Sequence, residues 1–205
     1  MSKKIGAVIL AAGSASRMGR QKLLLPLAGK PLLAHVLAGV RTFDWAACLA
    51  VIGEPAAELT SLCRDYQIPA VYNANRLSGQ ASSVNLALKT LPGRLEGIIF
   101  FQGDQPLVSP ALVEAILAQF EQAAGDKVII VPCHQGQRYS PVLFGSHWRS
   151  HLAGLQGDAG GRQIIRNRPE CVVELDWPEP APFYDADTWE EYLKLQLLAR
   201  HSAVQ

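Results

Sequence analysis

Three loops of the sequence carry residue types that can handle phosphate groups and a metal ion. The first loop, residues 12–22, follows an apolar run and reads AGSASRMGRQK. Small residues let backbone N–H groups approach phosphate oxygens closely, and Arg17 and Lys22 can neutralise the charge that develops when a diphosphate leaves. The loop has neither the G-x-G-x-x-G spacing of a dinucleotide-binding turn nor the G-K-[ST] ending of a P-loop. We therefore expect a phosphate-binding loop of another type; the alternative is a flexible turn with solvated cations.

The second loop, residues 102–106, reads QGDQP and places an acidic residue directly after an apolar run. Magnesium in proteins is bound through one or two carboxylates together with phosphate oxygens and water. Asp104 is therefore the first predicted Mg²⁺ ligand, and we assign it a catalytic role together with Arg17 and Lys22. An aspartate in this position could instead cap a helix or close a turn.

The third loop, residues 185–188, reads DADT and precedes the last segment of helical character. A second carboxylate on the same metal ion would let the ion clamp the α-phosphate and the leaving diphosphate. Asp185 is the predicted second ligand, and Asp187 stays open as the alternative. Asp187 or Thr188 could also serve only as the cap of the last helix, whose acidic first turn complements its positive end.

A polar stretch, residues 73–83, leads from an expected strand into an expected helix and reads NANRLSGQASS. Glycine permits close approach of a ligand, and serine hydroxyls with helix N-terminal N–H groups can hydrogen-bond a base or a ribose. Gly79 and Ser83 are therefore candidate nucleotide contacts. A polar turn with a serine cap explains the stretch equally well.

Alternating strands and helices position these loops. Short apolar runs rich in Val, Ile and Phe alternate with segments of helical period, the pattern of repeated β-α units and a mainly parallel sheet. The runs lack polar alternation, which indicates that both faces of the sheet are covered. In such a sheet ligands bind beyond the carboxyl ends of the strands, where the loops lie. The expected strands are residues 5–11, 48–53, 69–73, 97–102 and 127–132, and the expected helices are residues 31–40, 55–66, 80–91 and 110–123.

The rest of the chain is less regular. We expect a strand at residues 141–144, a short helix near residues 146–153, turns at residues 155–162 and a terminal helix from Thr188. Prolines suit the first turn of a helix, where a missing N–H costs nothing, and Ser109 is the expected N-cap before one of them. These first-turn prolines are Pro31, Pro55 and Pro110.

Composition excludes several classes of protein. With 49% hydrophobic and 18% charged residues, the 205-residue sequence is typical of one globular domain, and we treat residues 1–205 as such. A net charge of +1 and the absence of a basic block argue against nucleic acid as a partner. The N-terminal apolar run of about seven residues is too short for a signal peptide or a membrane span, so we expect a cytoplasmic protein without a membrane partner. The cysteines lack the paired spacing of a zinc site and are expected to be reduced.

Together these motifs resemble one family. L-A-A-G-x-x-x-R-M-G-x-x-K at residues 10–22, S-G-x-x-x-S at 78–83, G-D-x-P at 103–106 and D-x-D-T at 185–188 are similar to the motifs of the nucleotidyltransferases of molybdenum-cofactor maturation, within the broader MobA-like and sugar-nucleotide transferase group. The resemblance implies a three-layer, Rossmann-like α/β nucleotidyltransferase fold with a mainly parallel central sheet, and Mg²⁺ held by Asp104 and Asp185. The nucleotide contacts that it implies are Leu10, Ala11, Ala12, Gly13, Arg17, Lys22, Gly79 and Ser83.

Within that group, guanylyl-transferring members typically carry Gly-Gly where this chain has Ala12-Gly13. The Ala-Gly form, with G-D-x-G-x-R at residues 157–162, is similar to the molybdenum cofactor cytidylyltransferases. One physical reason is that the Ala12 methyl narrows the base pocket and favours a pyrimidine, although one methyl is worth only about 1–3 kcal/mol of discrimination. Asp158 and Arg162 would face the acceptor; the alternative is a turn held by a local Asp–Arg pair.

The resemblance also implies a reaction. The terminal phosphate of molybdopterin attacks the α-phosphate of CTP, which gives molybdopterin cytosine dinucleotide and diphosphate, and a molybdenum hydroxylase receives the product. Competing hypotheses keep the fold but use GTP or a sugar phosphate, or make the chain a non-catalytic carrier of a finished cofactor. The sequence departs from the family pattern at Trp189, where a proline is more usual after the threonine.

Overall fold

The computed structural model describes residues 3–13 and 21–202. Within them the chain folds around one large sheet with the strand order β10-β7-β9-β6-β1-β4-β5, and β8 pairs with β7 beside it. The strands are β1 (Ile5–Ala11), β4 (Ala47–Ile52), β5 (Ala70–Tyr72), β6 (Gly97–Gln102), β7 (Ile129–His134), β8 (Gln137–Arg138), β9 (Val142–Gly145) and β10 (Val172–Asp176). The five main strands and the strand near residues 141–144 were therefore predicted correctly within a few residues.

The sheet is mainly parallel, as predicted. β1 pairs in parallel with β4 and β6, β4 with β5, and β7 with β10, whereas β9 runs antiparallel between β6 and β7. Leu10 stands opposite Gln102 in the register of β1 and β6. The loops that follow these two strands consequently leave the same edge of the sheet as neighbours.

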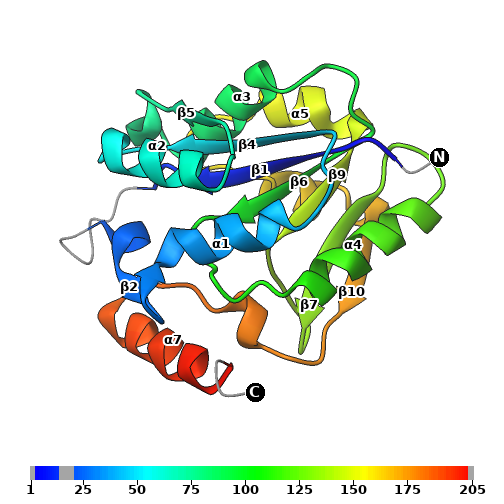
Figure 1. The fold of residues 1–205 in the computed structure, drawn as a ribbon. Coiled ribbons are helices and arrows are strands. Elements are labelled where there is room, and N and C mark those ends of the chain that lie inside the picture. The colour runs from blue at the N-terminus through cyan, green and yellow to red at the C-terminus, as the bar shows by residue number, and fades with distance from the viewer. Residues whose placement is uncertain (1–2, 14–20, 203–205) are drawn as a thin grey trace.

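Helices cover both faces of the sheet and give the predicted three layers (Figure 1). Alternate residues of β1 enter different cores: Ala7 and Ile9 pack on one face and Val8 on the other. Buried residues of four helices line the first face, and buried residues of three helices line the second. The first group is α1 (Leu32–Arg41), α2 (Ala56–Asp65), α4 (Pro110–Gln122) and α7 (Trp189–Ser202), and the second is α3 (Gln80–Thr90), α5 (Arg149–Ala153) and α6 (Arg162–Asn167).

Several short elements were not predicted from the sequence. A two-stranded hairpin, β2 (Pro26–Leu27) with β3 (Lys30–Pro31), follows the first loop, and β10 extends the sheet beyond β7. β10 is only partly buried because it forms one edge of the sheet, so its sequence lacks the apolar run of the inner strands. The 3-10 helices are η1 (Lys22–Leu24), η2 (Arg76–Ser78), η3 (Ser146–Trp148), η4 (Pro169–Cys171) and η5 (Ala181–Phe183), and η3 with α5 forms the short helix expected near residues 146–153.

The first residues of the helices show that one prediction was wrong and that another was right. Pro31 and Pro55 lie at the N-cap, one residue before α1 and α2, where an extended ψ leads the chain into the helix. Pro110 does occupy the first turn of α4, and the Ser109 hydroxyl accepts a hydrogen bond from the Leu112 N–H at 3.3 Å. The predicted terminal helix begins after Thr188, which exchanges hydrogen bonds with Glu191 in a capping box.

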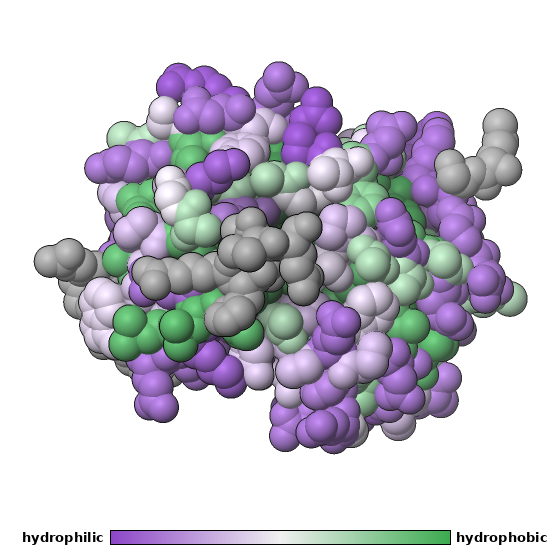
Figure 2. All heavy atoms as spheres, turned by 60° about the horizontal axis from the view of Figure 1, so that its bottom comes forward, coloured by the Kyte–Doolittle hydropathy of each residue, from purple (hydrophilic) through white to green (hydrophobic). Residues whose placement is uncertain are grey.

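The surface and the thiols complete the description of the fold. Hydrophilic residues are spread over the face drawn in Figure 2, with hydrophobic residues between them. No helix in the described part of the chain is long and apolar enough to cross a membrane. The four cysteines are free, and burial raises the pKa of the Cys48 and Cys63 thiols to about 11, which disfavours the reactive thiolate.

Candidate active site

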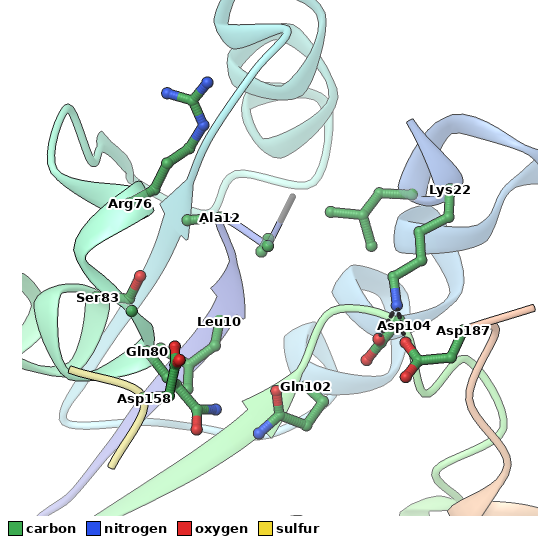
Figure 3. A pocket seen from close by; sticks show the side chains of 14 residues that line it. Leu10, Ala12, Lys22, Arg76, Gln80, Ser83, Gln102, Asp104, Asp158 and Asp187 are labelled. Carbon is green, nitrogen blue, oxygen red and sulfur yellow. Dashed lines mark hydrogen bonds and ion pairs between the residues drawn. The ribbon is translucent and has the colours of Figure 1, made fainter. Parts of the chain in front are cut away.

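Two adjoining cavities open at the carboxyl ends of β1 and β6. The first has a volume of about 300 Å³ and the second about 770 Å³. Both are lined by two carboxylates, Asp104 and Asp187, so these side chains lie where the cavities meet. Figure 3 looks into the first cavity, with Lys22, Asp104 and Asp187 on one side and Ser83, Gln80 and Asp158 on the other.

Lys22 connects three loops at the junction of the cavities. Its Nζ lies 2.5 Å from Oδ2 of Asp104, in the loop after β6, and 2.6 Å from Oδ1 of Asp187, just before α7. Burial alone would lower the pKa of Lys22, but the two carboxylates outweigh it and raise the pKa. The ammonium group is therefore fully charged at neutral pH, in a position to meet an anionic ligand in the first cavity, which Lys22 lines.

Among the residues that the structure describes, acidic groups outnumber cations around Lys22. Burial first, and then the neighbouring carboxylates Asp104, Asp187 and Glu191, raise the pKa of Asp185 to about 6 against the opposing effect of Lys22. Such a surplus of carboxylates fits a hard divalent cation, which would offset the repulsion. In the described part of the chain, however, no group of three or more His, Cys, Asp or Glu side chains is arranged to hold a metal ion by itself. Phosphate oxygens and water would have to complete the coordination.

The two predicted second ligands take different positions. Asp187 lines both cavities and binds Lys22 beside Asp104, whereas Asp185 lines only the second cavity. Thr188 caps α7, so the Asp187 carboxylate is not used as the cap and lies in the site beside Lys22. The prediction named Asp185 first, and the D-x-D motif itself was the signal for Asp187.

The loop after β1 lines the first cavity as far as it is described. Leu10, Ala11, Ala12 and Gly13 all border that cavity, and the Ala12 side chain is buried at 4% exposure. Gly103 packs against this segment: its N–H donates to the Leu10 carbonyl at 2.9 Å, and an added Cβ would lie 3.1 Å from that oxygen. Arg17, predicted to bind phosphate and to act in catalysis, lies outside the described residues.

The start of α3 forms the opposite wall. Asn73, only 2% exposed, donates from Nδ2 to the hydroxyls of Ser82 and Ser83 at 2.9 Å each, and its Oδ1 accepts from the Asn75 N–H. This buried amide fixes Ser83 at the cavity wall. Gly79, at φ +96°, also lines the first cavity.

Asp158 and Arg162 face different cavities. Asp158 lines the first, together with Gly79 and Ser83, whereas Arg162 lines the second. No salt bridge joins these two described side chains, so the local Asp–Arg pair considered for this turn is absent. In the second cavity Arg162 is accompanied by Tyr139 and Phe183, whose rings stack at 4.4 Å.

Sequence reasoning missed three polar residues of the first cavity, namely Arg76, Gln80 and Gln102. Arg76 and Gln80 flank Gly79 in the polar stretch that had been singled out, so they could have been included. Gln102 is the last residue of β6, and its position directly before Gly103-Asp104 was the available signal. Gln80 and Gln102 also line the second cavity.

A mainly parallel three-layer fold with a lysine and carboxylates at the strand ends, beside two adjoining cavities, defines a nucleotidyl-transferring class of enzyme. Residues 7–172 match the family model of the MobA-like NTP transferase domain, and the chain belongs to this family.

Individual relatives agree with this assignment. The chain is 34% identical over 119 residues to the bifunctional protein GlmU of Lawsonia intracellularis, which covers 57% of this chain and 26% of GlmU. It is 35% identical over 119 residues to the 2-C-methyl-D-erythritol 4-phosphate cytidylyltransferase of Prochlorococcus marinus, with 54% of this chain and 52% of that protein covered. The chain thus spans only about a quarter to a half of the length of these relatives.

A solved structure matches along nearly the whole chain. The complex of Rv0371C from Mycobacterium tuberculosis H37Rv with manganese superposes with a TM-score of 0.79 at 26% identity, and covers 95% of this chain and 98% of that one. A protein with this fold and a related sequence has therefore been crystallised with a divalent metal ion.

Proposed function

We propose that this protein transfers CMP from CTP to molybdopterin carrying molybdenum, in a Mg²⁺-dependent reaction that yields molybdopterin cytosine dinucleotide and diphosphate. The observation that carries the proposal is the Lys22 ammonium held by Asp104 and Asp187 where the two cavities meet. One cavity would hold the triphosphate and the other the acceptor, so the reacting groups would meet at these charges. A molybdenum hydroxylase is the proposed recipient of the product.

The proposed chemistry needs little covalent participation from the protein. An oxygen of the acceptor's terminal phosphate forms a bond to the α-phosphorus, and the bond from that phosphorus to the bridging oxygen of the diphosphate breaks. Lys22, together with Arg17, neutralises the charge that accumulates on the leaving diphosphate. The walls of the two cavities hold the reactants in line, which supplies much of the rate enhancement.

Asp104 and Asp185 are the proposed Mg²⁺ ligands, with Asp187 as the alternative to Asp185. When bound, Mg²⁺ would neutralise charge on the α-phosphate and the leaving group. The surplus of carboxylates among the described residues beside Lys22 supports a divalent ion at this position, and the manganese complex of the mycobacterial structure supports a divalent ion in general.

CTP is proposed as the nucleotide for two reasons. Ala12, a buried residue at the cavity wall, adds a methyl where guanylyl-transferring relatives carry glycine, and this favours a pyrimidine. The Prochlorococcus relative is named as a cytidylyltransferase. The name of that relative gives a polyol phosphate as the acceptor, and cytidylyl transfer to such an ester is therefore the second candidate function.

The second cavity suits a flat acceptor that carries a phosphate. Aromatic side chains of Tyr139 and Phe183 offer an apolar wall, and Arg138 and Arg162 supply positive charge. Arg138 is partly neutralised by Glu174 at 2.7 Å, so Arg162 is the stronger candidate for the phosphate.

Diphosphate release tests the proposal. The protein is incubated with Mg²⁺ and either CTP or GTP, in the presence of molybdopterin carrying molybdenum, of 2-C-methyl-D-erythritol 4-phosphate, or of no acceptor. Release with CTP that depends on the molybdenum cofactor is expected. Diphosphate release with GTP but not with CTP would contradict the cytidylyl assignment. Diphosphate release that requires the polyol phosphate as acceptor would favour the second candidate function.

The variant Asp104→Ala tests the metal role in the same assay. Loss of a carboxylate that holds Mg²⁺ at the phosphates is expected to lower kcat by at least about 100-fold. Asp65→Ala, an exposed aspartate at the end of α2, is the matched control and should keep wild-type turnover. Turnover of Asp104→Ala near the wild-type rate would rule out the assigned role.

A further inference from the structure

The first cavity has two chemically different ends (Figure 3). Lys22 with Asp104 and Asp187 lies at one end, and Ser83, Gln80 and Asp158 line the other. If the proposed function holds, the triphosphate belongs at the end that has the Lys22 ammonium and Asp104, a proposed Mg²⁺ ligand. The nucleobase then lies at the end that contains Asp158.

The backbone of Asp158 is fixed against the start of α3. The Gly157 carbonyl accepts a hydrogen bond from the Ala81 N–H at 3.0 Å. A Cβ added to Gly79 would lie only 2.3 Å from that carbonyl group and 2.6 Å from the Asp158 nitrogen, so the two segments are in direct contact. Gly157, at φ +59°, permits the turn that places Asp158 beside the cavity.

The carboxylate of Asp158 has no hydrogen bond or salt bridge to any other side chain that the structure describes. A negative group in a cavity that takes a polyanion weakens binding, unless the ligand brings a hydrogen-bond donor to it. An ionised carboxylate can only accept hydrogen bonds, and it pairs well with the exocyclic amino group of cytosine. Uracil and thymine carry a carbonyl oxygen at the same ring position, which would face the carboxylate with repulsion.

We propose that Asp158 selects the base of the nucleotide by accepting a hydrogen bond from its amino group, and so excludes UTP and TTP. Adenine and guanine also carry amino groups, and the Ala12 methyl, on the wall of the same cavity, opposes the larger purines. The two residues together read cytosine: Ala12 limits the size of the base and Asp158 requires the amino group. This assigns Asp158 to the nucleotide, whereas its sequence motif had suggested the acceptor.

Calorimetric titration of the full chain with CTP and with UTP, in the presence of Mg²⁺, tests this role. Wild-type protein is expected to bind CTP at least about tenfold more tightly than UTP. Asp158→Asn can donate to a carbonyl as well as accept from an amino group, so the ratio should fall to within about twofold, mainly through tighter UTP binding. Asp65→Asn, the same change on α2 away from both cavities, should keep the wild-type ratio.

The outcomes separate the inference from the function on which it rests. Failure of the wild type to bind any nucleoside triphosphate would overturn the proposed function and the inference with it. Preferential binding of CTP that survives unchanged in Asp158→Asn would overturn only the role of Asp158. The same holds if Asp158→Asn alters the KM of the acceptor while the CTP to UTP ratio stays as in the wild type.

Discussion

At the scale of single residues, the site depends on the balance of charge around one lysine. Lys22 is 13% exposed and is shared by Asp104 and Asp187, while Asp185 lies close enough to feel both carboxylates. The described part of this arrangement holds more negative than positive charge. We therefore expect the protein without a bound cation to be less stable than its packing alone would allow, a common consequence of a site that binds a cation.

The free energy of unfolding of the variant Asp185→Asn, measured at two pH values, should reveal this destabilisation. The pKa of Asp185 is raised from 3.8 to about 6 on folding, so the protonated form is favoured in the folded state, and this contribution to stability is lost as the pH rises through that range. At pH of about 7.5 the variant should gain about 1 kcal/mol in free energy of unfolding, after allowance for solvent screening, and at pH of about 4 it should gain nothing. Urea unfolding without metal measures both.

A control and a metal titration complete that experiment. Asp65→Asn should change stability equally little at both pH values, because its side chain is exposed. Added Mg²⁺ should raise the melting temperature of the wild type more than that of Asp185→Asn. A loss of stability at the higher pH in Asp185→Asn would contradict the repulsion argument.

At the scale of elements, the first cavity depends on close contact between the start of α3 and the loop at residues 157–158. Gly79 makes this contact possible because it lacks a side chain and accepts φ +96°. The buried Asn73 amide then holds the serines of the first turn of α3 in place. Two segments far apart in the sequence thus form one wall.

Gly79→Ala should disrupt that wall. The left-handed backbone and the contact with Gly157 predict a loss of at least about 2 kcal/mol in free energy of unfolding, together with weaker CTP binding. Gly93→Ala is the matched control, since an added Cβ there has no neighbour within 4 Å, and its effect should stay within about 0.5 kcal/mol. Denaturant unfolding and calorimetry measure the two effects. Equal stabilities of the two variants would show that the contact is readily relieved.

At the scale of the whole molecule, two cavities share Asp104 and Asp187, and under the proposed function they would separate the binding of the two reactants. The first cavity, proposed for the nucleotide, is lined by residues of β1, α3 and the loop at residues 157–158. The second cavity involves β9, α6 and the segment before α7. Substitutions in one cavity should therefore affect one substrate more than the other.

Arg162→Ala tests this separation. Removal of its charge from the second cavity should raise the KM of the acceptor about tenfold and leave the affinity for CTP unchanged. Arg166→Ala, one turn later on α6, removes an exposed charge that lines neither cavity, and should leave both constants alone. Steady-state kinetics at saturating CTP gives the comparison. Weaker CTP binding together with an unchanged KM for the acceptor would show that Arg162 acts on the nucleotide and not on the acceptor.

The sequence by itself determined the fold class, because the alternation of apolar runs and helical segments is a local pattern that reports burial on both faces of a sheet. It also indicated the three loops that meet at the site, since parallel strands end at one edge. The edge strand β10 and the β2–β3 hairpin were not predicted, because short, partly exposed strands leave little periodic pattern in the sequence.

Only the tertiary structure decided how the candidate residues divide between the cavities. Asp158 and Arg162 are four positions apart and seemed one motif, but the turn at Gly157 directs one to each cavity. Likewise, Asp187 rather than Asp185 binds Lys22, because side-chain direction in an irregular segment follows from its packing and not from its spacing. The types and the order of the candidate residues can be read from the sequence, but which of them contact one another depends on the folded chain.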